Sequence, residues 1–269
     1  MADADALREA GVPDRLAGSA GTQAPAPTPA SPAPPADGSV MTLVDHLTEL
    51  RSRIVRSVLA ILAGSAVGFY FAPAITELLI SPLPEKVRHL QVLDPGGGFA
   101  ITLRIAVVTG IILAMPVLLF QVWRFVAPGL TPSERRALRP WIPLALAFFA
   151  LGVSIAWFIL PFAIAFLLAF TNDVLVANLA AAPYFDFVTT MFLAFGLLME
   201  FPIVVFALAR VGILSSARLR ASRRFVFLGI LIFAAVATPG GDLVSPSVLG
   251  GTMYLLFELT ILAIRRSGR

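Results

Sequence analysis

The sequence predicts an all-α polytopic membrane protein with six membrane-spanning helices. Of its 269 residues, 58% are hydrophobic and 13% are charged, whereas a soluble domain has roughly a quarter of its residues charged. The apolar residues also fall into six long runs. Spanning ~30 Å of hydrocarbon takes about 20 helical residues, and four of the six runs come close to that length or exceed it.

Residues 1–40 differ in composition from the rest of the chain. They are rich in alanine and proline, with APAPTPASPAPPADGS at their core. Such a segment buries too little apolar surface to offset the entropy of ordering it. We therefore expect a disordered cytoplasmic tail over 1–40, a six-helix transmembrane domain over 41–264 and a short basic cytoplasmic tail over 265–269.

The transmembrane domain is predicted to open with an amphipathic helix. The letters TLVD at 42–45 resemble a capping box, so the helix is expected to begin near residue 42. Leucine and isoleucine then recur at helical spacing, while His46, Glu49 and Arg53 occupy a neighbouring face. This lead-in is expected to lie at the membrane surface and to run directly into the first span, residues 57–75.

Five further apolar runs follow the first span. The fifth and sixth are shorter than the bilayer is thick, so we expect short helices there and a deformed membrane beside them. Three prolines inside the runs, Pro116, Pro161 and Pro202, are predicted to kink their helices. The predicted spans cover residues 105–126, 141–170, 187–211, 225–238 and 248–264.

The arginines set the predicted orientation, because basic residues are enriched in the cytoplasmic loops of membrane proteins. The span ends that share one side carry 15 arginines, and those on the other side carry three basic residues. Both termini and the loops around 130 and 217 are therefore expected in the cytoplasm. The larger set is Arg51, Arg53, Arg56, Arg124, Arg135, Arg136, Arg139, Arg210, Arg218, Arg220, Arg223, Arg224, Arg265, Arg266 and Arg269, and the smaller set is Lys86, Arg88 and Arg104.

Composition excludes several kinds of site. The chain has no cysteine and two histidines, which excludes disulfides, thiolate metal sites and a histidine metal cluster, and no cofactor is expected. The net charge of +4 arises from arginines at the ends of apolar runs, a distribution that indicates membrane orientation rather than nucleic-acid binding. The spans carry no serine–histidine pair, zinc motif or paired aspartates, so we do not expect an enzyme.

Polar residues inside the spans are candidates for function. A charged residue in the middle of an apolar run such as that around Glu200 costs roughly 2.5–3.5 kcal/mol on insertion, so Glu200 is a candidate site. The alternative is a protonated glutamate that bonds a neighbouring helix, with Gln121 as a candidate partner. Gln121, Glu258 and Tyr254 are explained equally well by hydrogen bonds that join helices.

Two ordered stretches resemble a known family. HLTELRSR at 46–53 is the first, and PVLLFQVWRFVAPGL at 116–130, followed by ERR at 134–136, is the second. Together they closely resemble TatC, the receptor subunit of the twin-arginine protein translocase, and the resemblance covers about residues 41–264. Shorter matches are SPL at 81–83, FG at 195–196, EFP at 200–202, and TP at 238–239 with Asp242 after it.

The resemblance implies a cup-shaped bundle in the bacterial cytoplasmic membrane that recognises signal peptides bearing two adjacent arginines. Such a protein helps folded proteins cross the membrane, driven by the proton-motive force. The resemblance also implies a multimeric receptor complex, with the single-span subunits TatA and TatB as partners that meet the fifth and sixth helices.

The resemblance assigns roles to individual acidic residues. Glu49 and Glu134 match the carboxylates that hold the arginine pair. Glu200 matches the intramembrane glutamate of the fourth helix, and Asp242 matches an aspartate on the periplasmic side. His46 and Arg51 lie in the same amino-terminal motif as Glu49 and are counted with the signal-peptide site.

Both cytoplasmic carboxylates also have a simpler explanation. Guanidinium groups fit carboxylates in a bidentate fork, which favours acids at a site for arginine pairs. However, Glu49 precedes Arg53 by four residues, the favourable order for a helix pair worth ~0.2–0.5 kcal/mol. Glu134 lies in a loop beside Arg135 and Arg136, which neutralise it unless it projects away from them towards Glu49.

The alternative function is a proton-coupled small-molecule transporter, in which buried acids such as Glu200 and Glu258 are coupling sites. Against this alternative, the two halves of the chain show no inverted repeat and no interrupted helices at matching positions.

Overall fold

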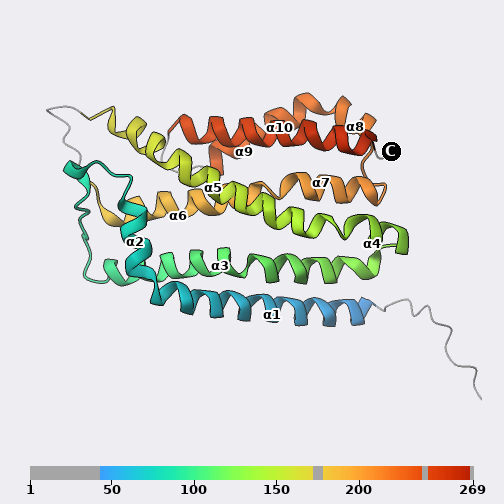
Figure 1. Cartoon of the computed structure of the whole chain (residues 1–269), viewed down its shortest axis with the longest axis horizontal. Coiled ribbons are helices and arrows are strands. Elements are labelled where there is room, and N and C mark those ends of the chain that lie inside the picture. The colour runs from blue at the N-terminus through green and yellow to red at the C-terminus, as the bar shows by residue number, and fades with distance from the viewer. Residues whose placement is uncertain (1–42, 172–177, 238–241, 267–269) are drawn as a thin grey trace, which may run out of the picture. The chain divides into compact units, whose positions relative to one another are not determined.

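The computed structural model describes residues 43–171, 178–237 and 242–266. Within these ranges the regular elements are helices (Figure 1), apart from an isolated parallel β-bridge between Gln91 and Ala180. Five helical stretches are long and apolar enough to cross a membrane, which confirms the predicted all-α membrane protein. They correspond to five of the six predicted spans, and the helix at the fifth predicted span is shorter than these five. The expected tail over 1–40, the TP pair at 238–239 and residues 267–269 lie outside the described residues.

The first crossing is α1, Leu43–Tyr70, which is one continuous helix. The amphipathic lead-in therefore extends the span instead of forming a separate surface helix. The crossing ends five residues earlier than predicted, and a short helix, α2 (Ala72–Ile80), follows it. Pro73 explains the break, because its ring would crowd the carbonyl of Phe69 in a continued α1, whereas proline is tolerated in the first turn of a new helix.

The next two crossings are α3 (Gly97–Val126) and α5 (Trp141–Leu168), joined through the short helix α4 (Pro132–Leu138). Helix α3 begins eight residues before the predicted run. Both long helices continue through their internal prolines, Pro116 and Pro161.

Proline has a stronger effect in the fourth crossing. This crossing consists of α6 (Ala181–Leu198) and α7 (Phe201–Arg210), with Glu200 between them and Pro202 in the first turn of α7. Pro202 lacks the N–H that would bond the carbonyl of Leu198, so the ladder of hydrogen bonds is interrupted there. The expected kink is thus a break between two helices.

The last two crossings differ in length. Helix α9 (Arg223–Ala237) follows the short α8 (Ser216–Ala221), and its 15 residues rise ~22 Å, less than the thickness of the hydrocarbon. Helix α10 (Val244–Arg266) has 23 residues and rises ~34 Å. The sixth helix is therefore longer than the predicted run, because polar residues at both of its ends are helical too.

Small residues let neighbouring helices approach closely, as is usual in membrane bundles. Helix α1 packs on α3, α5 on α6, and α9 on α10. A Cβ atom added to Gly64 of α1 would lie 2.7 Å from the carbonyl oxygen of Gly110 in α3, and one added to Gly152 of α5 would lie 2.8 Å from Cγ of Met199. Most of the best-buried large side chains, among them Phe195 and Phe257, belong to α5, α6 and α10.

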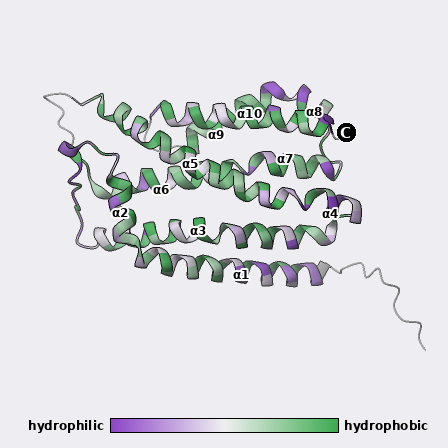
Figure 2. Cartoon of the chain, viewed as in Figure 1, coloured by the Kyte–Doolittle hydropathy of each residue, from purple (hydrophilic) through white to green (hydrophobic). Residues whose placement is uncertain are grey.

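The chain segments that the arginine pattern assigns to one side lie at one end of the helices. Figure 1 shows the beginning of α1, the short helices α4 and α8 and the end of α10 together, with α2 at the opposite end. Hydrophilic residues gather near the two ends, and the lengths between them are mostly hydrophobic (Figure 2).

Candidate functional site

Glu49 and Arg53 form an ion pair one turn apart on α1. Nη2 of Arg53 donates a hydrogen bond to Oε1 of Glu49 at 2.8 Å, as the four-residue spacing predicts. Both side chains are largely buried, with 17% of Glu49 and 12% of Arg53 exposed. The second carboxylate oxygen, Oε2 of Glu49, is buried and has no hydrogen-bond partner.

Gln121 of α3 extends this pair into a three-residue network. Nη1 of Arg53 donates to Oε1 of Gln121 at 3.2 Å, so the guanidinium bridges α1 and α3. Gln121 is itself buried. The structure therefore gives Gln121 a partner other than Glu200, the alternative considered from the sequence.

The polar face of the lead-in is turned towards α3. The ring of His46 stacks on Phe125 of α3, with 4.4 Å between ring centroids, while Leu47 and Ile54 are more than half exposed. A soluble amphipathic helix shows the opposite arrangement. Here the apolar side chains are exposed, as expected of a helix that faces lipid, and the network of Glu49 lies between helices. Arg51 is exposed on the outer side.

Glu134 caps a helix and does not lie in a loop. It is the third residue of α4, and its Oε2 accepts hydrogen bonds from the backbone N–H of Thr131 at 3.0 Å and from the Thr131 hydroxyl at 2.8 Å. The backbone N–H of Glu134 donates in return to Oγ1 of Thr131. This reciprocal arrangement is a capping box, and the pattern Thr-Pro-Ser-Glu at 131–134 is typical of that motif.

The neighbouring arginine is also committed to local structure. Nε and Nη2 of Arg135 donate to the carbonyl oxygen of Ala127 at 3.2 and 2.7 Å, which ties α4 to the end of α3. Arg135 is thus bonded to a backbone carbonyl. Glu49 and Glu134 belong to segments that share one end of the helices (Figure 1), each bound within its own segment.

Glu200 occupies the break in the fourth crossing. Its side chain is 8% exposed, and Oε1 is buried with no hydrogen-bond partner. Its backbone carbonyl accepts from the N–H groups of Ile203 and Val204 at 3.0 and 3.1 Å, which starts α7. The carboxyl group of Glu200 is therefore buried at the interruption of the fourth crossing.

Asp242 has a capping role at the start of α10. Oδ1 of Asp242 accepts from the backbone N–H of Ser245 at 2.6 Å, and this bond satisfies one of the unpaired donors at a helix beginning. The side chain is 3% exposed, and its Oδ2 is buried with no partner.

Glu258 joins the last two crossings. Nη2 of Arg223, the first residue of α9, donates to Oε2 of Glu258 at 2.6 Å, and the hydroxyl of Tyr254 donates to Oε1 at 3.2 Å. Sequence reasoning missed this pairing, because 35 residues separate Arg223 from Glu258 and no local pattern marks them as neighbours. Within the described residues, no group of three or more acidic or histidine side chains suited to a metal ion is found.

Comparison with known proteins agrees with this architecture. The family model described as Sec-independent protein translocase protein (TatC) matches residues 45–251. Among proteins named Sec-independent protein translocase protein TatC, that of Carboxydothermus hydrogenoformans is 35% identical over 82% of this chain and 91% of its own length. The protein of Azotobacter chroococcum is 38% identical over 82% and 88%, respectively.

A solved structure shares the fold. The crystal structure titled Twin Arginine Translocase Receptor TatC has a TM-score of 0.72 and 33% sequence identity to this chain, and the match covers 83% of this chain and all of that one. None of the comparisons favours the transporter alternative. The family match over most of the length, the sequence identity and the shared fold agree: this chain belongs to the TatC family of Sec-independent protein translocase proteins.

Proposed function

We propose that this chain is the signal-peptide-binding subunit of a bacterial twin-arginine translocase, with both termini on the cytoplasmic side of the cytoplasmic membrane. Family membership and the likeness to a structure titled as a translocase receptor support this proposal. The arginine-rich ends of the helices support the orientation, because basic loops are retained in the cytoplasm.

One observation carries the assignment of Glu49. Its carboxylate uses Oε1 for Arg53, while Oε2 has no partner. A buried, unbonded carboxylate oxygen is costly, and an arginine of a signal peptide would satisfy it with a charge-assisted hydrogen bond. Within the ion pair on α1, Oε2 of Glu49 is thus the acceptor proposed for the guanidinium of the peptide.

Gln121 makes the exchange of partners feasible. When Glu49 turns towards the guanidinium of the peptide, Arg53 retains the hydrogen bond to Oε1 of Gln121. A buried guanidinium without any acceptor would oppose that movement. We therefore assign Gln121 a positioning role in peptide binding, with His46 and Arg51 flanking the site on α1.

Glu134 is proposed as the second carboxylate for the arginine pair. The capping box fixes its position at the beginning of α4. The sequence-based alternative is a loop acid neutralised by Arg135 and Arg136; Glu134 instead lies in α4, and Arg135 donates to the carbonyl oxygen of Ala127.

The remaining polar residues fit later steps of transport. We propose that the apolar part of the signal peptide proceeds along the bundle towards Glu200, and that transport draws on the proton-motive force. The partner subunits TatA and TatB would meet α9 and α10. For Glu258 and Asp242 the hydrogen bonds favour structural roles, one joining α9 to α10 and one capping α10.

Photocrosslinking tests the peptide site. A photoreactive amino acid replaces Ser52, which is exposed and lies three residues after Glu49, on the same side of α1. We expect crosslinks to a signal peptide with two arginines and few to one with two lysines, since lysine cannot form the bidentate fork. The double variant Glu49→Gln, Glu134→Gln should lose most of the crosslinking.

Two controls make the result decisive. The variant Glu85→Gln neutralises an exposed acid in the segment between α2 and α3 and should crosslink like the unchanged protein. Membrane insertion of every variant is measured in parallel. Undiminished crosslinking in the inserted double variant would refute the assignment of the two carboxylates.

A further inference from the structure

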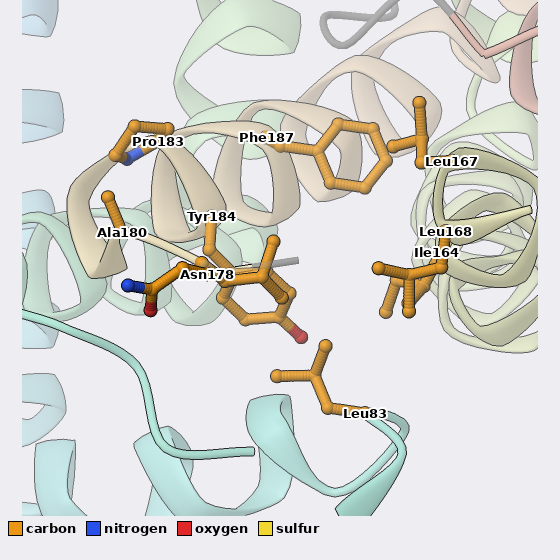
Figure 3. A pocket seen from close by; sticks show the side chains of 10 residues that line it. Leu83, Ile164, Leu167, Leu168, Asn178, Ala180, Pro183, Tyr184 and Phe187 are labelled. Atoms are coloured by element: carbon orange, nitrogen blue, oxygen red, sulfur yellow. The ribbon is translucent and has the colours of Figure 1, made fainter. Parts of the chain in front are cut away.

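An apolar pocket lies at the end of the helices opposite to Glu49. It has a volume of about 240 Å³ and opens between the end of α5, the beginning of α6 and the residues after α2. Figure 3 shows Ile164 and Leu168 of α5 on one side and Tyr184 of α6 on the other, with Leu83 below them.

The pocket offers almost no partner for water. Two of its ten lining residues, Tyr184 and Asn178, carry polar side chains. The Tyr184 hydroxyl donates to the carbonyl oxygen of Leu79 at 2.6 Å, so it is already bonded. In Figure 3 the amide of Asn178 lies on the side away from Ile164 and Leu168. Apolar cavities of ~150 Å³ stay dry and bind small hydrocarbons, which favours a hydrocarbon occupant here.

The depth of the pocket in the membrane follows from the length of α5. Its 28 residues rise ~42 Å, so both of its ends reach the headgroup region of a bilayer with a ~30 Å core. Ile164, Leu167 and Leu168 are within the last five residues of α5. The pocket therefore lies where acyl chains meet their headgroups.

A guanidinium group lies at the rim of this pocket. Nη2 of Arg88 donates to the carbonyl oxygens of Ser81 and Leu83 at 3.3 and 3.2 Å, and Leu83 lines the pocket. Arg88 is exposed, and its other donors make no bond to the described part of the chain. Arg104, also on this side, is paired with Asp186. Arg88 is thus a cation in the region where arginine is otherwise scarce.

We propose that this pocket and Arg88 form a phospholipid site. One acyl chain fills the pocket, and the Arg88 guanidinium donates to the phosphate, for which its planar fork is well suited. Glu85 and Lys86 are adjacent in the chain and carry opposite charges. Because these charges offset each other, we expect recognition of the phosphate by Arg88 and little contribution from the headgroup beyond it. The proposal requires membrane insertion alone and is independent of signal-peptide binding.

Native mass spectrometry of the purified chain tests the site. The protein is stripped in detergent and titrated with phosphatidylglycerol and with diacylglycerol, which has acyl chains and no phosphate. We expect one tightly held phosphatidylglycerol and weaker binding of diacylglycerol. Arg88→Gln should weaken phosphatidylglycerol binding about tenfold, the size of a lost charge-assisted hydrogen bond, and Leu167→Trp should weaken binding of both lipids by filling the pocket.

Matched controls keep the test falsifiable. Lys86→Gln removes a nearby exposed charge and should change binding at most about twofold, because solvent and salt screen it. Leu151→Trp makes the same substitution as Leu167→Trp at an exposed position of α5 and should leave binding unchanged. Equal binding of the two lipids, or unchanged binding in both Arg88→Gln and Leu167→Trp, would overturn the proposal.

Discussion

Arg53 of α1 donates a hydrogen bond from Nη1 to Oε1 of Gln121 in α3, at 3.2 Å. The contact crosses a helix interface near the candidate peptide site and gives the guanidinium an acceptor besides Glu49. Because this second acceptor decides how freely the Glu49 carboxylate can change partners, Gln121 is the most informative position outside the acidic residues themselves.

Replacing Gln121 should impair peptide binding without removing a carboxylate. In Gln121→Met, Arg53 keeps Glu49 as its acceptor, and a turn of Glu49 towards a peptide leaves a buried guanidinium unbonded. We expect the affinity for a twin-arginine peptide to fall about tenfold, on the order of one lost hydrogen bond to a charged group. Titration of a labelled peptide measures this. Gln121→Asn keeps an amide on a shorter side chain, so its peptide affinity should lie between those of the unchanged protein and Gln121→Met. Equal affinity in these three proteins would contradict the exchange of partners by Glu49.

Two substitutions at Glu134 separate its capping role from its charge. Glutamine also serves at the third position of a capping box, so Glu134→Gln should preserve α4, while Glu134→Ala should destabilise it by about 0.5–1 kcal/mol. Hydrogen exchange of residues 132–138 measures the helix, and peptide binding measures the charge. If Glu134→Gln binds the peptide normally, the carboxylate has a structural role alone.

Helix contact through glycine should be sensitive to a single methyl group. A Cβ atom on Gly110 would lie 2.8 Å from Cα of Ser65 in α1, whereas one on Gly229 of α9 meets nothing within 4 Å. Gly110→Ala should therefore destabilise the bundle by about 1–3 kcal/mol, and Gly229→Ala should be neutral or slightly stabilising. Thermal unfolding of the purified proteins compares them. Equal loss in both variants would indicate that α1 and α3 are not in close contact.

The absence of cysteine from the chain allows a direct test of orientation. Single cysteines are placed at two exposed positions, Ser133 in α4 and His89 in the segment after α2. A reagent that cannot cross the membrane should label His89→Cys in intact cells and Ser133→Cys after lysis alone. The reverse pattern would place both termini outside the cytoplasm and refute the orientation derived from the arginines.

The sequence predicted the crossings better than their ends. Apolar runs locate the spans because a helix that crosses the membrane needs apolar residues over the thickness of the hydrocarbon core. The helices themselves continue past these apolar residues. Ser245 and Arg266 therefore belong to α10, although hydropathy stops short of both. The three prolines predicted kinks: at Pro202 the fourth crossing is interrupted, and α3 and α5 are continuous helices that contain Pro116 and Pro161.

The candidate site shows a similar division between local and distant contacts. The bond of Glu49 to Arg53 follows from a four-residue spacing. The capping box of Glu134 corresponds to a pattern of four consecutive residues, 131–134. The contact of Arg53 with Gln121 spans 68 residues and depends on how α1 and α3 pack, which a single sequence does not encode in any local pattern.

The short β-bridge between Gln91 and Ala180 has a mechanical consequence. Gln91 donates to the carbonyl oxygen of Leu179 at 3.0 Å and accepts from the N–H of Ala181 at 2.8 Å, so two connecting segments are clasped at the end bearing α2. Cooperative backbone bonds of this kind resist separation more than a lone pair of side chains does. The bridge therefore restrains the separation of these two segments at the end that bears α2, whereas, within the described residues, the end that bears Glu49 lacks this restraint.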